Sequence, residues 1–224
     1  MKKITLSSLL VFIAVLPSCV KMPRYRKPDL HPFFNNPNDA RKINNVIVKV
    51  STLDTQTCEK IFGPRGKHIT QNRPLTRFVP CHLSIKNNSW HTLILKPKSI
   101  SLPLVPVERV IKRVSVYTPH RMGPFLGGAT ALALAKGAFI PAALFCGFSF
   151  ANMMRWSYYN EDLASTIYDL CLSSAITIEP QQQVDKIVFF KENEFKNEPL
   201  FITLYDIEDY RYALHFELDA REQQ

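Results

Sequence analysis

The chain has none of the common catalytic motifs. Neither the Gly-x-Ser-x-Gly nucleophile elbow nor the His-Glu-x-x-His metal-binding helix occurs, and no spaced pair of carboxylates is present. A phosphate-binding P-loop needs four residues between its glycines and a Ser or Thr after its lysine. Here only two residues separate Gly63 from Gly66, and His68 follows Lys67. We therefore expect a protein that is not an enzyme and uses no cofactor.

Residues that could hold a metal ion are equally scarce. Cys81, His82 and His91 are close in sequence. Neighbouring residues on a strand point to opposite faces, so at most two of these three side chains could converge on one ion. The acidic turn at 206–209 is typical of solvated loops rather than of cation sites. We interpret these residues as ordinary structural ones and expect no metal site.

The first 19 residues have the organisation of an export signal. Lys2 and Lys3 form a positive n-region, and residues 4–16 form an apolar h-region interrupted by three hydroxyl residues. Leu16-Pro17-Ser18-Cys19 then provides a cleavage site that ends in a cysteine. In these residues the chain resembles bacterial lipoproteins, whose signal is removed just before a lipid-bearing cysteine.

The resemblance implies that residues 1–18 are removed and that Cys19 carries diacylglycerol and a third acyl chain, expected to be palmitate. Two or three acyl chains hold a protein on a membrane almost permanently. We therefore expect a lipid-anchored membrane protein of the bacterial cell envelope, at the outer membrane and facing the periplasm. Two alternatives remain open: an ordinary signal cut by the general peptidase, and an uncut anchor, for which the h-region is short.

Residues 19–43 are expected to form a stiff basic tether. Between residues 20 and 43, six Lys and Arg stand against two Asp, and prolines occupy positions 23, 28, 32 and 37. Near anionic headgroups each basic residue contributes about 1 kcal/mol to membrane binding. Removal of residues 1–18, which hold two lysines, leaves 26 Lys and Arg against 19 Asp and Glu, a net charge of +7. No nucleic-acid recognition motif accompanies this charge, so we expect no nucleic-acid partner.

Segments 44–104 and 175–219 have the pattern of short strands. Residues 45–53 alternate three apolar valines with residues of the opposite face, as a half-buried strand does. Asparagines tolerate positive φ, so residues 87–89 predict a hairpin turn between strands at 77–86 and 90–96. The segment 100–104 extends the second of these strands or starts another. Further strands are predicted at 175–179, 184–191, 200–206 and 210–218, of which the last two form a closing hairpin.

A short helix is predicted after the strand at 45–53. Asp54 is its predicted N-cap, and Gly63 supplies its C-terminal stop. Cys58, Ile61 and Phe62 share one face of this helix, which we expect to be buried. The segment from Gly63 to position 74 is expected to be a long loop.

Residues 105–174 read as a helical insertion between the two strand-rich segments. Four apolar residues from Val107 to Val114 share one helical face, and three basic residues lie elsewhere on it, so a basic amphipathic helix is predicted. Residues 122–154 contain a single charge, Lys136, and five of the seven glycines of the chain. Asn160 is the predicted cap of a last helix whose inward residues are Leu163, Ile167 and Leu170.

We interpret residues 122–154 as an apolar helical hairpin that returns to the side on which it starts. A helix that crossed the membrane once would put the two strand-rich segments in different compartments. The hairpin either dips into the membrane or packs within the protein or an oligomer, and a true span is a third alternative.

The expected fold class is mainly β with a helical insertion (α+β). Seven or eight short strands predict an immunoglobulin-like antiparallel β-sandwich, interrupted by the apolar helical hairpin. This pattern resembles that of extracytoplasmic bacterial lipoproteins with a sandwich domain, a likeness that implies no activity.

Four cysteines remain besides Cys19. An oxidising envelope permits a disulfide between Cys58 and Cys81, which would close the long loop, whereas cysteines are also common as small buried residues. Cys146 lies in the apolar segment and is expected to be unpaired.

Two classes of function fit these features. The first is a non-enzymatic interaction or scaffold domain, held by its lipid and presented to another envelope protein. The second is a membrane-inserting component that oligomerises, or docks on a membrane complex, through the Gly/Ala-rich hairpin. The expected partners are therefore membrane lipid, an envelope protein or further copies of the same chain.

Overall fold

The computed structural model describes residues 39–71, 77–115, 139–209 and 211–218. At residues 39 and 139–153 it describes the backbone alone. Of the described residues, 139–162 belong to one compact unit and all the others to a second. The second unit contains every described strand, and it is mainly β, as the sequence predicts. The predicted lipidation residue Cys19, the predicted tether up to residue 38 and residues 122–138 of the apolar segment lie outside the described residues.

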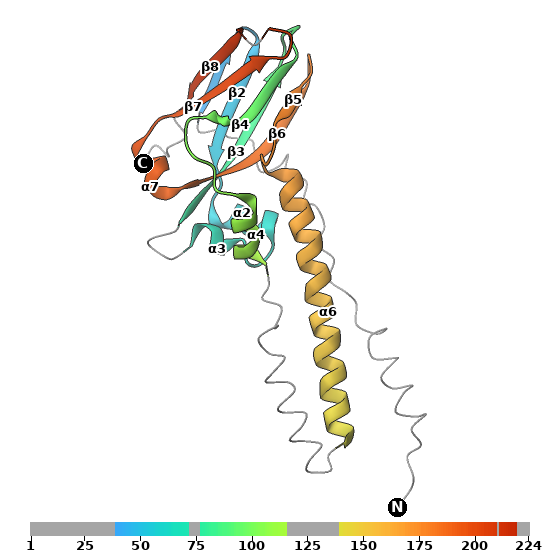
Figure 1. Cartoon of the computed structure of the whole chain (residues 1–224). Helices are drawn as coiled ribbons and strands as arrows, with labels where there is room; N and C mark the ends of the chain where they lie inside the picture. Colours follow the sequence, from blue (N-terminus) through green and yellow to red (C-terminus); the bar gives the residue numbers. More distant parts are fainter. Residues whose placement is uncertain (1–38, 72–76, 116–138, 210, 219–224) are drawn as a thin grey trace, which may run out of the picture. The chain divides into compact units, whose positions relative to one another are not determined.

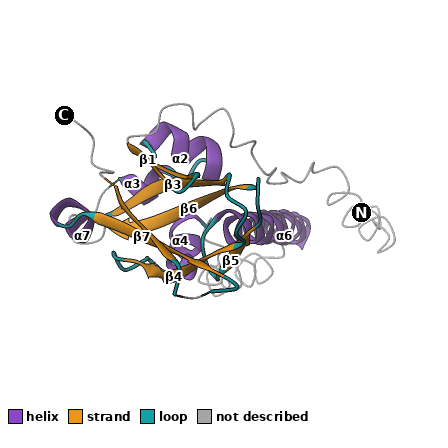
Figure 2. Ribbon diagram, turned by 90° about the horizontal axis from the view of Figure 1, so that it is seen from above, coloured by secondary structure: helices purple, strands orange, loops and turns teal. Residues whose placement is uncertain are grey.

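Eight strands of the described chain form two antiparallel sheets of four strands each (Figure 1). The first sheet has the order β1-β2-β3-β6, and the second has the order β5-β4-β7-β8. Seen from above, the sheets form two layers (Figure 2). The strand bounds are β1 Asp39–Ile43, β2 Val46–Thr52, β3 Phe78–Asn87, β4 Leu93–Ile100, β5 Ile176–Ile178, β6 Gln183–Lys191, β7 Leu200–Asp206 and β8 Ala213–Leu218.

The hydrophobic core lies between the two sheets and draws apolar residues from both. The predicted alternation in β2 is confirmed, since Val46, Val48 and Val50 are all at most 1 % exposed. Leu204 of β7 and Phe216 of β8 face them from the second sheet and are fully buried. Such two-layer packing is the arrangement of a β-sandwich.

A tight hairpin joins β1 and β2. Asn44 and Asn45 have φ values of 47° and 64°, and Ile43 pairs with Val46. Positive φ at both central residues is what a two-residue type I′ turn requires, and its twist matches that of the flanking strands. Residues 39–43, which the sequence assigned to the tether, are thus strand β1.

The prediction of a hairpin at residues 87–89 is wrong. β3 and β4 belong to different sheets, so this turn carries the chain from one layer to the other. Neither Asn87 nor Asn88 has a positive φ. Asn87 is fully buried instead, and its amide Nδ2 donates to the carbonyl oxygens of His91, Ile178 and Glu179 at 2.7, 3.1 and 3.2 Å. Asparagine is used here for its hydrogen bonds rather than for its backbone freedom.

Three short helices lie at one end of the sheets (Figure 1): α2 Thr55–Phe62, α3 Lys67–Thr70 and α4 Val107–Val114. The prediction for α2 is confirmed, because the Asp54 carboxylate accepts a hydrogen bond from the Thr57 N–H at 2.7 Å and Gly63 caps the other end at φ 76°. Its predicted buried face of Cys58, Ile61 and Phe62 is confirmed as well. The helix α3 interrupts the segment that we expected to be a loop.

Two further helices follow, α6 Phe139–Leu170 and α7 Glu192–Asn197. The sequence did not predict α7. Asn160 is not a cap, because α6 runs through it without a break. Leu163, Ile167 and Leu170 are buried as predicted, at most 5 % exposed. No helix in the described ranges combines the length and hydrophobicity needed to cross a membrane.

Gly66, directly before α3, lies against the backbone of α2. A Cβ atom at this position would clash with the carbonyl of Cys58 and lie 2.8 Å from the backbone nitrogen of Glu59. We predict that Gly66→Ala lowers the free energy of unfolding by about 2 kcal/mol, because backbone atoms of α2 would have to shift. Urea unfolding measures this loss. Gln56→Ala, at an exposed position of α2, is the control and should stay within about 0.5 kcal/mol of the parent. Equal midpoints for the two variants would contradict the contact.

Candidate functional site

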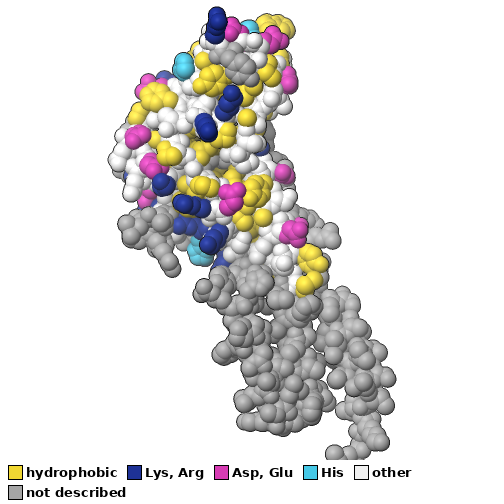
Figure 3. Space-filling view, in the orientation of Figure 1, with side chains coloured by type: hydrophobic (Ala, Val, Ile, Leu, Met, Phe, Trp, Pro, Cys, Tyr) yellow, Lys and Arg dark blue, Asp and Glu magenta, His cyan; other side chains and the backbone are white. Residues whose placement is uncertain are grey.

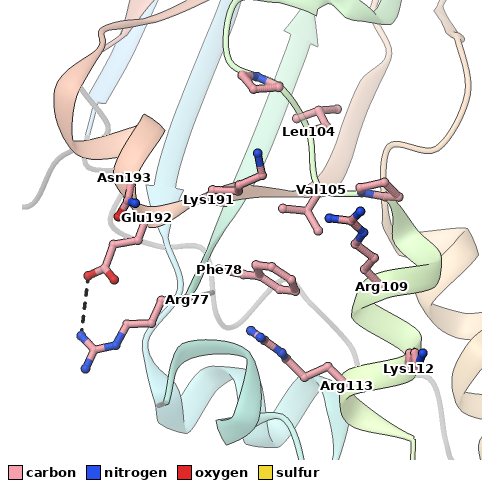
Figure 4. A pocket seen from close by; sticks show the side chains of 12 residues that line it. Arg77, Phe78, Leu104, Val105, Arg109, Lys112, Arg113, Lys191, Glu192 and Asn193 are labelled. Atoms are coloured by element: carbon pink, nitrogen blue, oxygen red, sulfur yellow. Dashed lines mark ion pairs between the residues drawn. The ribbon is translucent and has the colours of Figure 1, made fainter. Parts of the chain in front are cut away.

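A cleft of about 600 Å³ opens where β3, β6 and α4 come together. Phe78 begins β3 and pairs with Lys191 at the end of β6, so both side chains lie at the same end of the first sheet. The segment 103–106, which leads into α4, forms another wall (Figure 4). This segment is fixed to β6 because the Val105 N–H donates to the Phe189 carbonyl at 2.7 Å.

Part of the cleft lining is apolar. Phe78 lies in the middle of the view in Figure 4, and Leu104 and Val105 lie above it. Pro103 and Pro106 complete this side. The prolines have no N–H to satisfy, so this wall offers few polar partners to a ligand.

The remaining lining is strongly basic. Five cationic side chains from three separate segments reach the cleft: Arg77, Arg109, Lys112, Arg113 and Lys191. In Figure 3, Lys and Arg side chains gather on the face where α4 and α7 lie in Figure 1. Glu192 is the one carboxylate among the described lining residues.

The helix α4 supplies three of the five charges. Val107, Val110 and Val114 are buried and turn one face of the helix to the protein. Arg109 and Arg113 are four residues apart and therefore lie one above the other on the polar face. The predicted basic amphipathic helix is thus confirmed, and its polar face borders the cleft.

Contacts within the cleft hold Arg113 and the end of α4 in place. The Arg113 guanidinium lies over the Phe78 ring, 4.0 Å from its centroid (Figure 4). Such cation–π contacts contribute about 0.5–1 kcal/mol at exposed sites. Beyond the cleft, Arg65 Nη1 donates to the carbonyl oxygen of Ser115, directly after the last residue of α4. The guanidinium is therefore oriented before any ligand arrives.

The acidic groups near the cleft are already paired. Glu192 lies 2.8 Å from Lys196 Nζ and 3.6 Å from Arg77 Nη1. The hydrogen bond from Lys196 is the main reason that the pKa of Glu192 lies below its ordinary value. Lys191 Nζ is 2.8 Å from Glu194. Arg109 and Lys112 have no carboxylate partner within ion-pair distance among the described residues, so the cleft keeps an excess of positive charge.

This arrangement is suited to binding an anion. The described lining residues include no His, Cys, Ser or Thr. Guanidinium groups donate several hydrogen bonds in a fixed plane and match the oxygens of carboxylates and phosphates.

The structure separates the histidines that are close in sequence. His82 Nε2 lies 3.0 Å from Asp185 Oδ1, whereas His91 Nδ1 lies 2.6 Å from Asp206 Oδ2. No three His, Cys, Asp or Glu side chains of the described residues form a group that could hold a metal.

The prediction of a solvated acidic turn is wrong for Asp206, because this residue is only 2 % exposed. Burial raises the pKa of Asp206, but bonds from the Glu208 and Asp209 backbone and the nearby His91 lower it further, so the pKa lies below its ordinary value. The sequence did not predict this His91–Asp206 pair.

Cys58 and Cys81 are both buried and are free thiols in the structure. They lie near each other, since Cys58 contributes to the raised pKa of Cys81. Burial, with a contribution from Asp54, raises the pKa of Cys58 to about 12. Burial and the nearby Cys58 raise the pKa of Cys81. The disulfide between them stays a prediction. Cys171 is a further buried free thiol.

In comparisons with known proteins, no family model, no curated protein and no solved structure matches this chain. These comparisons therefore indicate no ligand for the cleft. Sequence reasoning found the basic face of α4 but not the cleft. Phe78 and Lys191 are more than a hundred residues apart in sequence, and only the pairing of β3 with β6 brings them beside α4.

The raised thiol pKa values predict slow modification of the folded protein. At pH 8 a thiol of pKa about 12 has roughly a thousandfold less thiolate than one at the ordinary value of 9.0. We expect Cys58 and Cys81 to react with iodoacetamide at least about a thousandfold more slowly in the folded chain than in urea, as followed by peptide mass spectrometry. Fast labelling of the folded chain would contradict their burial. Failure to label in urea until a reductant is added would reveal the predicted disulfide.

Proposed function

We propose that this protein is a lipid-anchored, non-enzymatic interaction domain of the bacterial cell envelope, and that its basic cleft docks an anionic partner. The observation that carries this proposal is the convergence of five basic side chains on one cleft, whose one carboxylate among the described residues is already paired. The lipobox-like sequence ending in Cys19 supports the anchor. The location that we propose for the anchored domain is the outer membrane, facing the periplasm.

We propose in addition that the sandwich is immunoglobulin-like. In that fold, strands A, B and E are neighbours in one sheet, and strands C, F and G are neighbours in the other. The orders β2-β3-β6 and β4-β7-β8 agree with these two sets, which supports the assignment. β1 and β5 are then additional edge strands, and the helical insertion lies between β4 and β5. Domains of this kind are common binding modules, because rigid sheets present loops and ends to partners.

A second candidate function is a membrane-inserting component that oligomerises or docks through the Gly/Ala-rich segment. The observation in its favour is that residues 139–154, in the first half of α6, contain no charged residue. In this case the lipid at Cys19 would bring the segment to the bilayer. The segment, rather than the cleft, would then make the contacts on which the function depends.

The anchor is tested by metabolic labelling with a palmitate analogue in a bacterial host. We expect the parent chain to be labelled and to stay with membranes after a carbonate wash, which removes peripheral proteins. Cys19→Ala should lose the label and be released by the wash, since the acyl chains hold the protein on the membrane. Release of the parent chain would contradict the anchor. Retention of a Cys19→Ala chain from which residues 1–18 have been cut would favour the membrane-inserting function instead, whereas an uncut signal would itself hold the chain on the membrane.

The cleft is tested with pyrophosphate, a small anion without an apolar part, bound to the full mature chain. In Arg109→Gln/Lys112→Gln we expect binding measured by calorimetry to weaken at least about tenfold, because charge-assisted hydrogen bonds contribute about 1.5–3 kcal/mol each. Lys49→Gln/Lys86→Gln makes the same change of charge at exposed positions of β2 and β3 and should bind within about twofold of the parent. Equal losses in both double variants would show that only net charge matters and would refute docking in the cleft.

A further inference from the structure

Trp90 is the most exposed large apolar side chain in the described part of the chain, with 89 % of its surface open to solvent. It lies in the turn between β3 and β4, at the end of the sheets away from α2, α3 and α4 (Figure 1). The basic cleft is at the other end of β3, where Phe78 lies. A single exposed apolar residue is common on protein surfaces and does not by itself make a binding site. The turn that carries Trp90 differs from an ordinary surface loop in the way it is held.

Buried hydrogen bonds fix this turn on both sides of Trp90. The Asn87 Oδ1 atom accepts from the N–H and from the hydroxyl of Ser89, at 3.1 and 2.6 Å. The Asn87 amide also donates to the carbonyl of His91. Asn87 and Ser89 are both buried. The turn therefore presents Trp90 in a fixed place, so that little conformational entropy is lost when its ring contacts a ligand.

Three further loops are bonded to this turn through their backbones. They join β1 to β2, β5 to β6 and β7 to β8. The bonds run from the N–H groups of Asn88, Asn87 and Ile207 to the carbonyl oxygens of Asn45, Gln182 and Thr92, at 3.0, 2.9 and 2.9 Å. The four loops thus form one connected surface, and we call it the Trp90 surface.

His91 follows Trp90 and is oriented by a buried carboxylate. Its Nδ1 lies 2.6 Å from Asp206 Oδ2, and its ring stacks on that of Tyr212 with the centroids 5.2 Å apart. An ionised carboxylate only accepts hydrogen bonds, so Nδ1 carries the proton and Nε2 of the neutral ring is an acceptor. The His91 side chain is 52 % exposed, which leaves Nε2 to accept a hydrogen bond from a ligand.

The other exposed side chains of the Trp90 surface are mainly polar. Four of them are the amides of Asn44, Asn45, Gln181 and Gln182. The charged ones are Glu179, Glu208, Asp209 and Arg211. Amides both donate and accept hydrogen bonds, as the hydroxyl groups of a sugar do. The excess of carboxylates disfavours an anionic ligand here, in contrast to the basic cleft.

We propose that the Trp90 surface binds an oligosaccharide of uncharged pyranose sugars. One sugar lays the C–H bonds of its flat face on the Trp90 ring, and its hydroxyls exchange hydrogen bonds with His91 Nε2 and the nearby amides. The face of an aromatic ring is the negative side of its quadrupole and attracts the positively polarised hydrogens of C–H bonds. This inference goes beyond the proposed function, because it assigns a second binding site that does not involve the cleft.

The composition of the surface favours a saccharide over a polypeptide. Stable protein interfaces bury about 800 Å² on each partner around an apolar centre. Among the described residues of these loops, Trp90 and Ile207 are the two large apolar side chains that are exposed. One aromatic ring among groups that both donate and accept hydrogen bonds matches a sugar, which has an apolar face and a rim of hydroxyls.

The test uses the full mature chain carrying Trp156→Phe, which leaves Trp90 as its one tryptophan. Cellotetraose and N-acetylchitotetraose are titrated, since both are unbranched chains of β-linked pyranoses with C–H bonds on both ring faces. We expect at least one of them to change the Trp90 fluorescence in a saturable way. Glycerol at the same concentration of hydroxyl groups is the control and should leave the emission unchanged.

Matched variants, measured by calorimetry, assign the binding to Trp90. Trp90→Ala should weaken it at least about tenfold, as loss of a tryptophan anchor does, and Trp90→Phe should weaken it less, because a smaller ring remains. Phe201→Ala removes an exposed aromatic near the other end of β7 and should stay within about twofold of the parent. Equal thermal unfolding midpoints would show that the variants remain folded, and Trp90→Phe is the milder change if Trp90→Ala does not.

Three results would overturn the assignment. Trp90 fluorescence that responds to neither tetrasaccharide would exclude the sugar contact. Equal losses in Trp90→Ala and Phe201→Ala would show that the binding is not at this surface. Self-association that depends on Trp90, seen by analytical ultracentrifugation without saccharide binding, would assign the surface to a second copy of the chain. Arg109→Gln/Lys112→Gln should bind the tetrasaccharides within about twofold of the parent, so the cleft and the Trp90 surface succeed or fail separately.

Discussion

The central position of β3 is the constraint on which the arrangement of this protein depends. β3 pairs with β2 on one side and β6 on the other, and its residues are buried along nearly the whole strand. One end carries Phe78 into the cleft, and the other end carries Asn87 into the turn that joins the two sheets. A ten-residue strand spans roughly 30 Å, so the cleft and this turn lie at opposite ends of a rigid element.

The positions of the basic side chains matter more for binding than the net charge of the protein. The chain has a formal net charge of +9, which by itself indicates only weak attraction to anionic surfaces. The fold gathers part of that charge on α4 and at the ends of β3 and β6, beside an apolar wall. Guanidinium groups near low-dielectric surfaces interact more strongly with anions than the same groups spread over a solvated surface.

The helical insertion is joined to the sandwich at its two ends. The last eight residues of α6 belong to the unit that holds the strands, and Leu163, Ile167 and Leu170 are buried there. The Tyr168 hydroxyl donates to Glu108 of α4 at 3.1 Å, so the first and last helices of the insertion are bonded to each other.

Local patterns in the sequence determined much of the fold. The alternation of valines in β2, the Asp54 cap and Gly63 stop of α2, and the apolar face of α4 were predicted, because each depends on neighbours within a few residues. Only the tertiary structure decided that residues 87–89 join two sheets and that Phe78, Arg109 and Lys191 meet in one cleft. These features depend on which strands pair, and pairing is set by burial between distant segments rather than by any local signal.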